Sequence, residues 1–269
     1  MGTVKRKYIE SNGVRFSYLE TGPVEAPLLI LFHGGALTGH LNWSKHYEPL
    51  ATQHFHIISP DHRGHGRTNN PDSKFTSYGQ LAWDMIGFLE ALGLDKQKPS
   101  VVGHSSGALI ALHMSVYSPK LFARQILIGI HPFIGVSDSF KRGIERYYGT
   151  PNYRHPPTKG AYSIKFPLHA MSLWWAHKQT NWYQLMCQAW PMWIRPLELD
   201  KSDYKKIACP TLVISGTRDE FGTRQESAEL ANRIDGAQVI ALEGENHMFP
   251  VYKPELLREN ILPFLKNIH

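Results

Sequence analysis

The stretch VVGHSSGALIAL, from Val101 to Leu112, places Ser105 between two glycines where an apolar run changes into a helical pattern. The pattern G-x-S-x-G is typical of a nucleophilic serine on a sharp turn between a strand and a helix. It also occurs by chance in roughly one sequence in ten of this length and composition, so the pattern alone decides little. The surrounding segments have to show whether Ser105 lies on such a turn.

Short apolar runs alternate with helical patterns along most of the chain. Buried strands are indicated by APLLILFHGG, FHIISPDHRGHGRT, PSVVGH, FARQILIGI, CPTLVISGTRD and AQVIALEG. Helices are predicted over NWSKHYEPLATQ, TSYGQLAWDMIGFLEALGL, SSGALIALHMSVYS and TRQESAELANRI. A last helix is expected after Pro254, and Pro263 should kink it or end it early.

The N-terminal segment RKYIESNGVRFSYLETG predicts two short strands joined by a turn at Asn12 and Gly13. Strands that alternate with helices predict a mostly parallel sheet with helices on both faces. In such a sheet the functional residues gather at the carboxyl ends of the strands. Ser105 follows a buried strand and precedes a helix, so it lies at this edge.

The glycines on either side of Ser105 have a physical reason. The turn is so tight that side chains at positions 103 and 107 would collide with the neighbouring helix and strand. The N-terminus of the following helix faces the serine and favours the negative charge that develops during acyl transfer. Ser105 is therefore the candidate nucleophile.

A serine nucleophile needs a base and an acid that orients the base. His247 follows the predicted strand Gln238–Leu242, in ALEGENHMFP, and is the candidate base. Asp219 follows the preceding strand, in LVISGTRDEF, and is the candidate acid. The order serine, aspartate, histidine is the chain order of an α/β-hydrolase triad. Asp138, after the sixth strand, is retained as an alternative acid.

The sequence resembles the serine hydrolases of the α/β-hydrolase superfamily, in the branch with a cap inserted after the sixth strand. The motifs are LFHGG, DHRGHGRT, GHSSG, GTRD and NHMFP, within Ile9–Pro132 and Ile207–Phe264. The resemblance implies an eight-stranded, mostly parallel α/β-hydrolase sheet with helices on both faces. It also implies a core of residues 1–132 and 207–269 and a helical cap over residues 133–206.

The resemblance assigns the oxyanion hole to the N–H groups of Gly35 and Ser106, and the first donor becomes Ala36 if that residue lies closer to the substrate. The family's haloalkane dehalogenases and epoxide hydrolases use an aspartate where this chain has Ser105. Its proline iminopeptidases carry His-Gly-Gly-Pro-Gly, whereas Ala36 follows Gly35 here. Carbon–carbon bond hydrolases carry a longer glycine run in this loop, so that activity is not favoured.

Other polar residues are assigned structural roles. His33 resembles the family histidine that braces the oxyanion loop and takes no protons. Asp61, His62 and His65 lie close together in the sequence, but further ligands at a usable spacing do not follow them, so no metal site is expected. We interpret them as a turn held by polar contacts.

The insert, roughly Phe133 to Lys206, contains five of the seven tryptophans, and its segment LHAMSLWWAHKQTNWYQLMCQAWPMW is expected to form a helical hairpin interrupted by Pro191. For any single ring, packing within the cap is the simpler interpretation. A cap of this size has a limited interior, so some rings are expected to face the cleft above Ser105. The residues predicted to bind substrate are His104, Trp174, Trp182 and Met248.

These residues predict hydrolysis of a carboxylic ester or lactone, bulky and hydrophobic or aromatic, through an acyl-enzyme and without a cofactor. An ester is favoured over an amide because an alkoxide leaving group needs less help from the site than an amine does. A carbon–carbon bond hydrolase on the same triad is one alternative. A non-enzymatic receptor or binding protein that keeps the triad is another, because fold and motif do not fix the use.

Composition narrows the remaining classes. The net charge is +6, with ten Lys or Arg against five Asp or Glu between His131 and Lys205, yet no nucleic-acid module is present. We interpret this excess as solvated surface. Apolar runs are too short to span a bilayer, no secretory signal is evident, and the chain has two cysteines. The expectation is a cytoplasmic protein with a small-molecule substrate and no nucleic-acid or membrane partner; the oligomeric state stays open.

Overall fold

A twisted sheet forms the centre of the computed structural model, which describes residues 3–132, 137–150 and 152–266. In these residues the sheet has eight strands in the order β1-β2-β4-β3-β5-β6-β7-β8. β1 and β2 pair antiparallel with each other, and β2 pairs antiparallel with β4, whereas all other neighbours are parallel. The strands are Lys5–Ser11, Val14–Thr21, Leu28–Phe32, His56–Pro60, Ser100–His104, Arg124–Ile128, Thr211–Gly216 and Gln238–Leu242, numbered β1 to β8.

The hairpin of β1 and β2 has the predicted turn. Asn12 and Gly13 both have positive φ, 49° and 75°, as a two-residue turn between twisted strands requires. Ser11 and Val14 pair directly across the turn. The hairpin prediction is confirmed.

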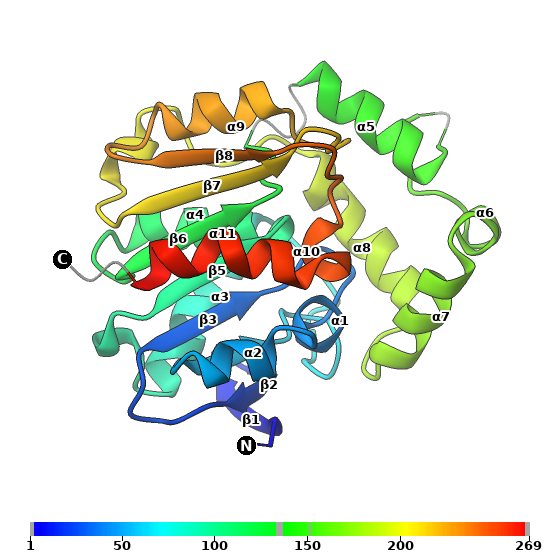
Figure 1. Ribbon diagram of the computed structural model, residues 1–269. Helices are drawn as coiled ribbons and strands as arrows, with labels where there is room; N and C mark the ends of the chain where they lie inside the picture. Colours follow the sequence, from blue (N-terminus) through cyan, green and yellow to red (C-terminus); the bar gives the residue numbers. More distant parts are fainter. Residues whose placement is uncertain (1–2, 133–136, 151, 267–269) are drawn as a thin grey trace.

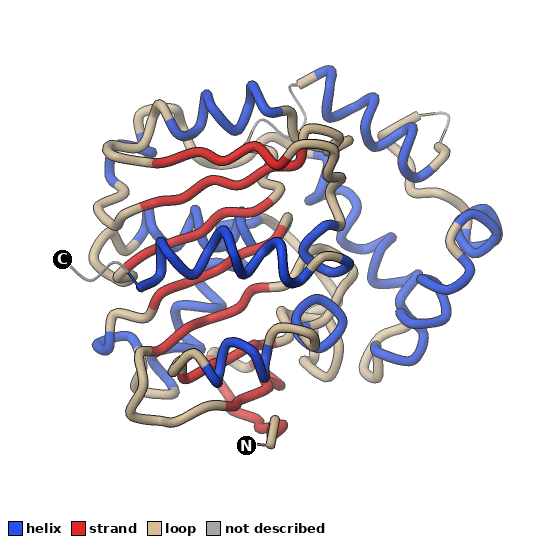
Figure 2. The backbone as a smooth tube through the Cα atoms, viewed as in Figure 1, coloured by secondary structure: helices blue, strands red, loops and turns tan. Residues whose placement is uncertain are grey.

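Helices cover both faces of the sheet (Figures 1 and 2). One apolar cluster packs α3 (Tyr78–Ala91), α4 (Ser106–Tyr117) and α9 (Arg224–Ala231) against one face. A second cluster packs α1 (Gly39–Trp43), α2 (Tyr47–Thr52) and α11 (Pro254–Lys266) against the other. The shorter elements are η1 (Asp95–Gln97) and α10 (Phe249–Tyr252). The predicted fold class is confirmed.

The segment after β3 differs in detail from the prediction. One helix was expected over NWSKHYEPLATQ, but the chain forms the separate helices α1 and α2. α1 begins at Gly39, with the Thr38 hydroxyl accepting the Leu41 N–H at its N-terminus. Between the helices, the His46 ring is buried and its Nε2 lies 2.8 Å from the Pro250 carbonyl oxygen. This contact with a distant segment stabilises the interruption between α1 and α2.

The described residues between β6 and β7 form four α-helices: α5 (Asp138–Tyr148), α6 (Lys159–Lys165), α7 (Pro167–Ala176) and α8 (Trp182–Ile194). The short element η2 (Asp203–Lys206) leads back to the sheet. We call α5 to α8 the cap helices. They lie beyond the carboxyl ends of the parallel strands (Figure 1). The division of the chain after residues 132 and 206 stays a prediction.

Two prolines do not end their helices, which corrects the expected interruption at Pro191 and the expected early end at Pro263. α8 continues through Pro191 to Ile194, and α11 continues through Pro263 to Lys266. Each proline lies in the last turn of its helix. A proline there removes one hydrogen bond to the preceding turn, but few residues follow that would have to bend away.

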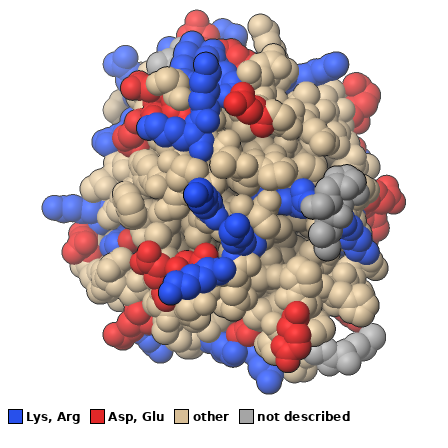
Figure 3. Space-filling model, turned by 90° about the vertical axis from the view of Figure 1, so that its left-hand side faces the viewer, with Lys and Arg blue, Asp and Glu red and all other residues tan. Residues whose placement is uncertain are grey.

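The surface at the amino ends of the parallel strands carries mixed charge. Lys and Arg side chains are interspersed with Asp and Glu on this face (Figure 3). Within the described residues, no helix has the length and apolar character needed to cross a membrane.

Candidate active site

Ser105 occupies the junction between β5 and α4. β5 ends at His104, α4 begins at Ser106, and Ser105 has φ 54° and ψ −117°. Its N–H donates to the Ile128 carbonyl of the neighbouring strand at 2.8 Å. A non-glycine residue in this conformation costs about 1–3 kcal/mol and persists only where surrounding contacts hold it. The strain presents the Ser105 hydroxyl above the carboxyl edge of the sheet.

At Gly103 and Gly107, on either side of Ser105, the surrounding backbone leaves no room for a side chain. A Cβ at Gly103 would lie 2.5 Å from the Gly107 carbonyl oxygen. A Cβ at Gly107 would lie 2.5 Å from the Phe32 carbonyl oxygen and 2.7 Å from that of His33. The collisions expected from the sequence are therefore present, and they involve backbone that cannot move aside.

Gly107→Ala is expected to destabilise the protein by about 3 kcal/mol, because the added methyl group meets two backbone carbonyls. The measurement is the free energy of unfolding by urea. Gly160→Ala is the matched control, since a Cβ at this helical glycine in α6 meets nothing within 4 Å. The control should be neutral or slightly stabilising. Equal stability of the two variants would contradict this account of the turn.

Two loops at the same edge of the sheet bring His247 and Asp219 to Ser105. The Ser105 Oγ lies 2.9 Å from His247 Nε2, and His247 Nδ1 lies 2.9 Å from Asp219 Oδ2. The carboxylate can only accept, so the imidazole proton lies on Nδ1 and Nε2 is free to accept the Ser105 proton. Residues far apart in the sequence thus form one continuous hydrogen-bonded chain.

Asp219 is fixed on both of its oxygens. Oδ1 accepts the N–H groups of Phe221 at 2.9 Å and Gly222 at 3.3 Å, which leaves Oδ2 for His247. The side chain is fully buried. Burial alone would raise the pKa of Asp219. The charge of His247, its hydrogen bond and the hydrogen bond from the Phe221 N–H together hold the pKa below its usual value. Asp219 therefore faces His247 as a carboxylate.

The alternative acid, Asp138, lies elsewhere. Asp138 is the first residue of α5, its side chain is 75% exposed, and it pairs with Lys141 at 3.1 Å. Glu245, near the base in sequence, pairs with Lys253 at 2.6 Å. Of these carboxylates only Asp219 is hydrogen-bonded to His247.

Backbone N–H groups of Gly35 and Ser106 meet beside Ser105. Within the described part of the chain, neither N–H is occupied by a hydrogen bond. A Cβ at Gly35 would lie 2.9 Å from Ser106 Oγ, so the two loops touch. Ala36 has φ 57°, which turns the chain sharply after Gly35. Both residues line the cavity beside Ser105, and the assignment of their N–H groups to an oxyanion hole stays a prediction.

The comparison with protein families agrees with this geometry. A family model described as the alpha/beta hydrolase family matches residues 29–259. The chain belongs to the alpha/beta hydrolase family. This match includes Ser105, Asp219 and His247 and the insertion that carries the cap helices.

Relatives of this alpha/beta hydrolase include enzymes with different named substrates. The 2-hydroxy-6-oxo-6-(2'-aminophenyl)hexa-2,4-dienoic acid hydrolase of Metapseudomonas resinovorans is 24% identical, over 96% of this chain and 90% of the relative. The bifunctional esterase/perhydrolase of Acinetobacter calcoaceticus is 24% identical, over 99% of this chain and 100% of the relative. The enol-lactonase structure from Burkholderia xenovorans has a TM-score of 0.74 at 24% identity, over 97% of this chain and 100% of that one.

His33 braces the loop that carries Gly35. Its Nδ1 donates to the Gly34 carbonyl at 2.7 Å, and its Nε2 accepts the His62 N–H at 3.0 Å. Burial lowers the pKa of His33 to about 3, so the ring stays neutral in this arrangement. Both ring nitrogens are occupied by backbone, as a structural histidine requires.

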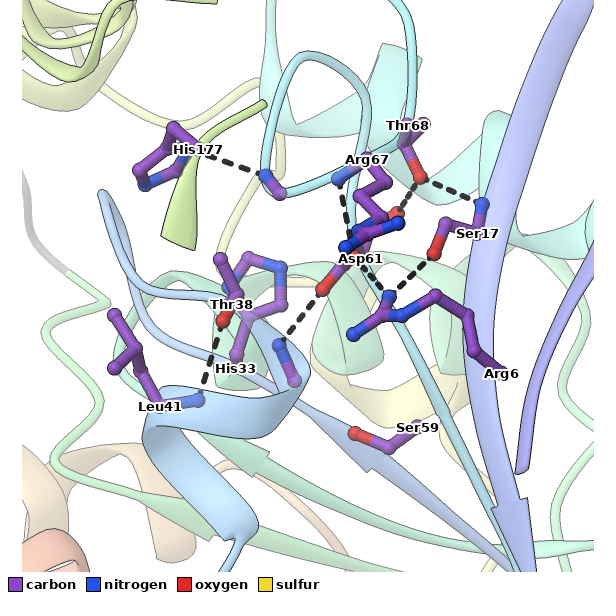
Figure 4. Close-up of polar contacts among 12 residues, drawn as sticks. Arg6, Ser17, His33, Thr38, Leu41, Ser59, Asp61, Arg67, Thr68 and His177 are labelled. Carbon is purple, nitrogen blue, oxygen red and sulfur yellow. Dashed lines mark hydrogen bonds and ion pairs between the residues drawn. The ribbon is translucent and has the colours of Figure 1, made fainter. Parts of the chain in front are cut away.

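The turn that contains Asp61 supports the same loop from the other side (Figure 4). Asp61 accepts the Gly39 N–H at 3.0 Å and the Arg67 N–H at 3.2 Å, and it pairs with Arg6 at 3.1 Å. Thr68 donates to the Asp61 carbonyl at 2.7 Å. Within the residues that the structure describes, no group of His, Cys, Asp or Glu is arranged to hold a metal ion.

A cap residue, His177, contacts this turn (Figure 4) and also the loop that carries Gly35. Its Nδ1 accepts the Gly66 N–H at 3.1 Å, so Nε2 carries the proton and donates to the Ala36 carbonyl at 2.8 Å. The Lys178 N–H donates to the Gly66 carbonyl at 2.8 Å. Burial lowers the pKa of His177, which favours the neutral ring that this pattern needs. Three hydrogen bonds thus tie the end of α7 to the core.

A cavity between the sheet and the cap helices opens beside Ser105. Of the predicted substrate-binding residues, His104 and Met248 line it. Trp174 and Trp182 do not, which corrects the sequence expectation: Trp174 is 60% exposed, and Trp182 is buried against Tyr162 inside the cap. The apolar and aromatic lining residues are Leu37, Tyr78, Phe140, Ile144, Tyr147, Tyr148, Tyr162, Trp193 and Phe221.

Two cavity residues were missed by the sequence reasoning. His131 follows β6 and lies with its ring centre 6.1 Å from that of His247, and burial lowers its pKa to about 4. His169, on α7, lines the cavity, and its buried Nε2 has no hydrogen-bond partner in the described structure. The position after β6 is a signal that could have identified His131. His169 lies within a helix whose orientation no motif defines.

Proposed function

We propose that this alpha/beta hydrolase is a serine hydrolase that cleaves carboxylic esters or lactones through an acyl-enzyme. The observation that carries the proposal is the chain from Ser105 Oγ through His247 to the buried Asp219, with 2.9 Å at both steps. A hydroxyl that donates to a neutral, oriented imidazole is the activated nucleophile of acyl transfer.

Ser105 attacks the substrate carbonyl while its proton passes to His247 Nε2. Asp219 stabilises the imidazolium, and the N–H groups of Gly35 and Ser106 bind the oxyanion; each such donor is typically worth about 3 kcal/mol of barrier. The imidazolium then gives its proton to the departing alkoxide. Water, deprotonated by His247, attacks the acyl-enzyme, and the carboxylic acid leaves as Ser105 regains its proton.

The cavity lining favours an uncharged hydrophobic or aromatic substrate. Among the described residues that line it, none is Lys, Arg, Asp or Glu. Burial raises the pKa of the Tyr148 hydroxyl well above its usual value, so it faces the cavity uncharged. We propose that the aromatic walls bind an aryl or bulky apolar group, that His104 and Met248 form the wall next to His247, and that His169 Nε2 binds a polar atom of the substrate.

A substrate panel tests this proposal. We expect kcat/KM to rise from acetyl to octanoyl and aryl-acyl esters, because the larger groups bury more apolar surface. The same panel should contain a γ-lactone and a vinylogous diketone, since one relative is named for a dienoic acid. A preference for acetyl esters would contradict the hydrophobic assignment. Faster hydrolysis of the diketone than of every ester would replace the ester proposal by carbon–carbon bond cleavage.

A further inference from the structure

One face of the cap exposes large apolar side chains to solvent. We define the cap apolar face as the five residues of α6 and α7 that combine a large apolar side chain with high exposure. They are Ile164 (84% exposed), Leu168 (76%), Met171 (55%), Trp174 (60%) and Trp175 (61%). Single exposed apolar residues are normal, but a contiguous group marks an interaction surface.

The helices that carry this face are already packed on their other side. Tyr162, Ala170 and Leu173 are buried against the remainder of the cap, and His169 lines the cavity. Leu168, Met171 and Trp175 follow helical spacing along the outer side of α7. α6 and α7 lie at the edge of the molecule away from the sheet (Figure 1). The packing of the cap itself therefore does not use the cap apolar face.

The charged side chains of α6, α7 and the residues next to them have one sign. The sequence has no Asp or Glu between Glu145 and Glu198. Lys159, Lys165 and Lys178 are exposed in or beside α6 and α7, and the Lys178 ammonium lies 5.1 Å from the centre of the Trp175 ring. The face at the opposite end of the molecule mixes both signs instead (Figure 3). The partner of the cap apolar face should thus be apolar and negatively charged.

We propose that the cap apolar face docks on the surface of a lipid bilayer that contains anionic lipids. A second copy of this chain fits less well, because a symmetric contact would bring the same lysines of both copies together. A bilayer surface offers acyl chains to Leu168 and Met171, an interfacial layer to the two tryptophans, and anionic headgroups to the lysines. The expectation of no membrane partner rested on apolar run lengths, which bear only on membrane spanning.

The location gives docking a consequence for the site. His169 and Tyr162 place the cavity lining on the same two helices whose outer side carries the cap apolar face. A docked molecule would hold its cavity within one helix layer of the bilayer, where apolar esters concentrate. The docking proposal itself does not depend on the reaction, because binding is measured without a substrate.

Co-sedimentation with vesicles tests the proposal. The full-length protein should bind vesicles of phosphatidylcholine and phosphatidylglycerol in equal parts, bind pure phosphatidylcholine far less, and release at high salt. Tryptophan emission should shift to the blue on binding. The double substitution Trp174→Ser with Trp175→Ser should weaken binding at least about tenfold, because two aromatic anchors are lost. Lys159→Glu with Lys178→Glu should weaken it by a similar factor.

Trp83→Ser is the matched control, because Trp83 is 57% exposed but lies on α3 of the core. It should bind vesicles like the unmodified protein, and circular dichroism should show that all variants are folded. Binding that is absent from both vesicles, equal on both, or retained in the Trp174/Trp175 variant would overturn the proposal. So would a concentration-dependent dimer that only this variant abolishes, since the face would then cover a second copy.

Discussion

Ser105→Ala is expected to lower kcat for ester hydrolysis by about 10⁶-fold, as removal of the nucleophile does in serine proteases. A fluorophosphonate probe should attach once to the unmodified protein, at Ser105, and not at all to the variant. The physical reason is local: the Ser105 Oγ is held above the sheet by a strained backbone and donates to His247 at 2.9 Å. Mass spectrometry of the labelled protein identifies the modified residue.

Ser118→Ala serves as the control for this experiment. Ser118 follows the opposite end of α4, so its loss leaves the junction with β5 untouched. Labelling and hydrolysis by this variant should match the unmodified protein. A folded protein that takes no label, or takes it at a residue other than Ser105, would remove the serine hydrolase proposal while leaving the fold and the docking proposal intact.

Asp219→Asn is expected to leave the fold unchanged and to lower kcat by about 10⁴-fold. The Phe221 and Gly222 N–H groups select the amide oxygen for the position of Oδ1, which turns the amide NH₂ toward His247. The imidazole must then accept at Nδ1 and carry its proton on Nε2. In that tautomer His247 cannot take the proton of Ser105. Steady-state kinetics and thermal unfolding measure the two parts of the prediction.

Asp138→Asn tests the alternative acid under the same conditions. Its side chain is 75% exposed and pairs only with Lys141, at 3.1 Å, among the contacts that the structure describes. We expect full activity from this variant. If Asp138→Asn loses activity while Asp219→Asn keeps it, the acid comes from the segment after the sixth strand and the assignment of Asp219 fails.

The sequence was sufficient for the core because local patterns and chain order act together there. Buried five-residue strands, the Asn12–Gly13 turn and the alternation of strands with helices all have short-range signals. The glycines at 103 and 107 have a steric reason that can be stated without coordinates, and the distances bear it out. Ser105, Asp219 and His247 each follow a strand, so the sheet alone brings them to one edge.

The cap could not be predicted in the same way. α7 is apolar on more than one side, so its sequence pattern does not say which side faces the cavity. Trp174 was expected there and is exposed, whereas His169, five residues earlier, lines the cavity. Pro191 was expected to interrupt a helix that continues to Ile194. These outcomes depend on tertiary packing, which overrides local preference.

His177 links the position of the cap to the loop that carries Gly35. Its ring is hydrogen-bonded to the Gly66 N–H of the core and to the carbonyl of Ala36, the residue after Gly35. Displacement of α7 would break both hydrogen bonds of the His177 ring and remove this contact between the cap and the loop. The loop of Gly35 is thus held from the core through His33 and from the cap through His177. A substitution of His177 would therefore change the surroundings of Gly35 without touching Ser105, Asp219 or His247.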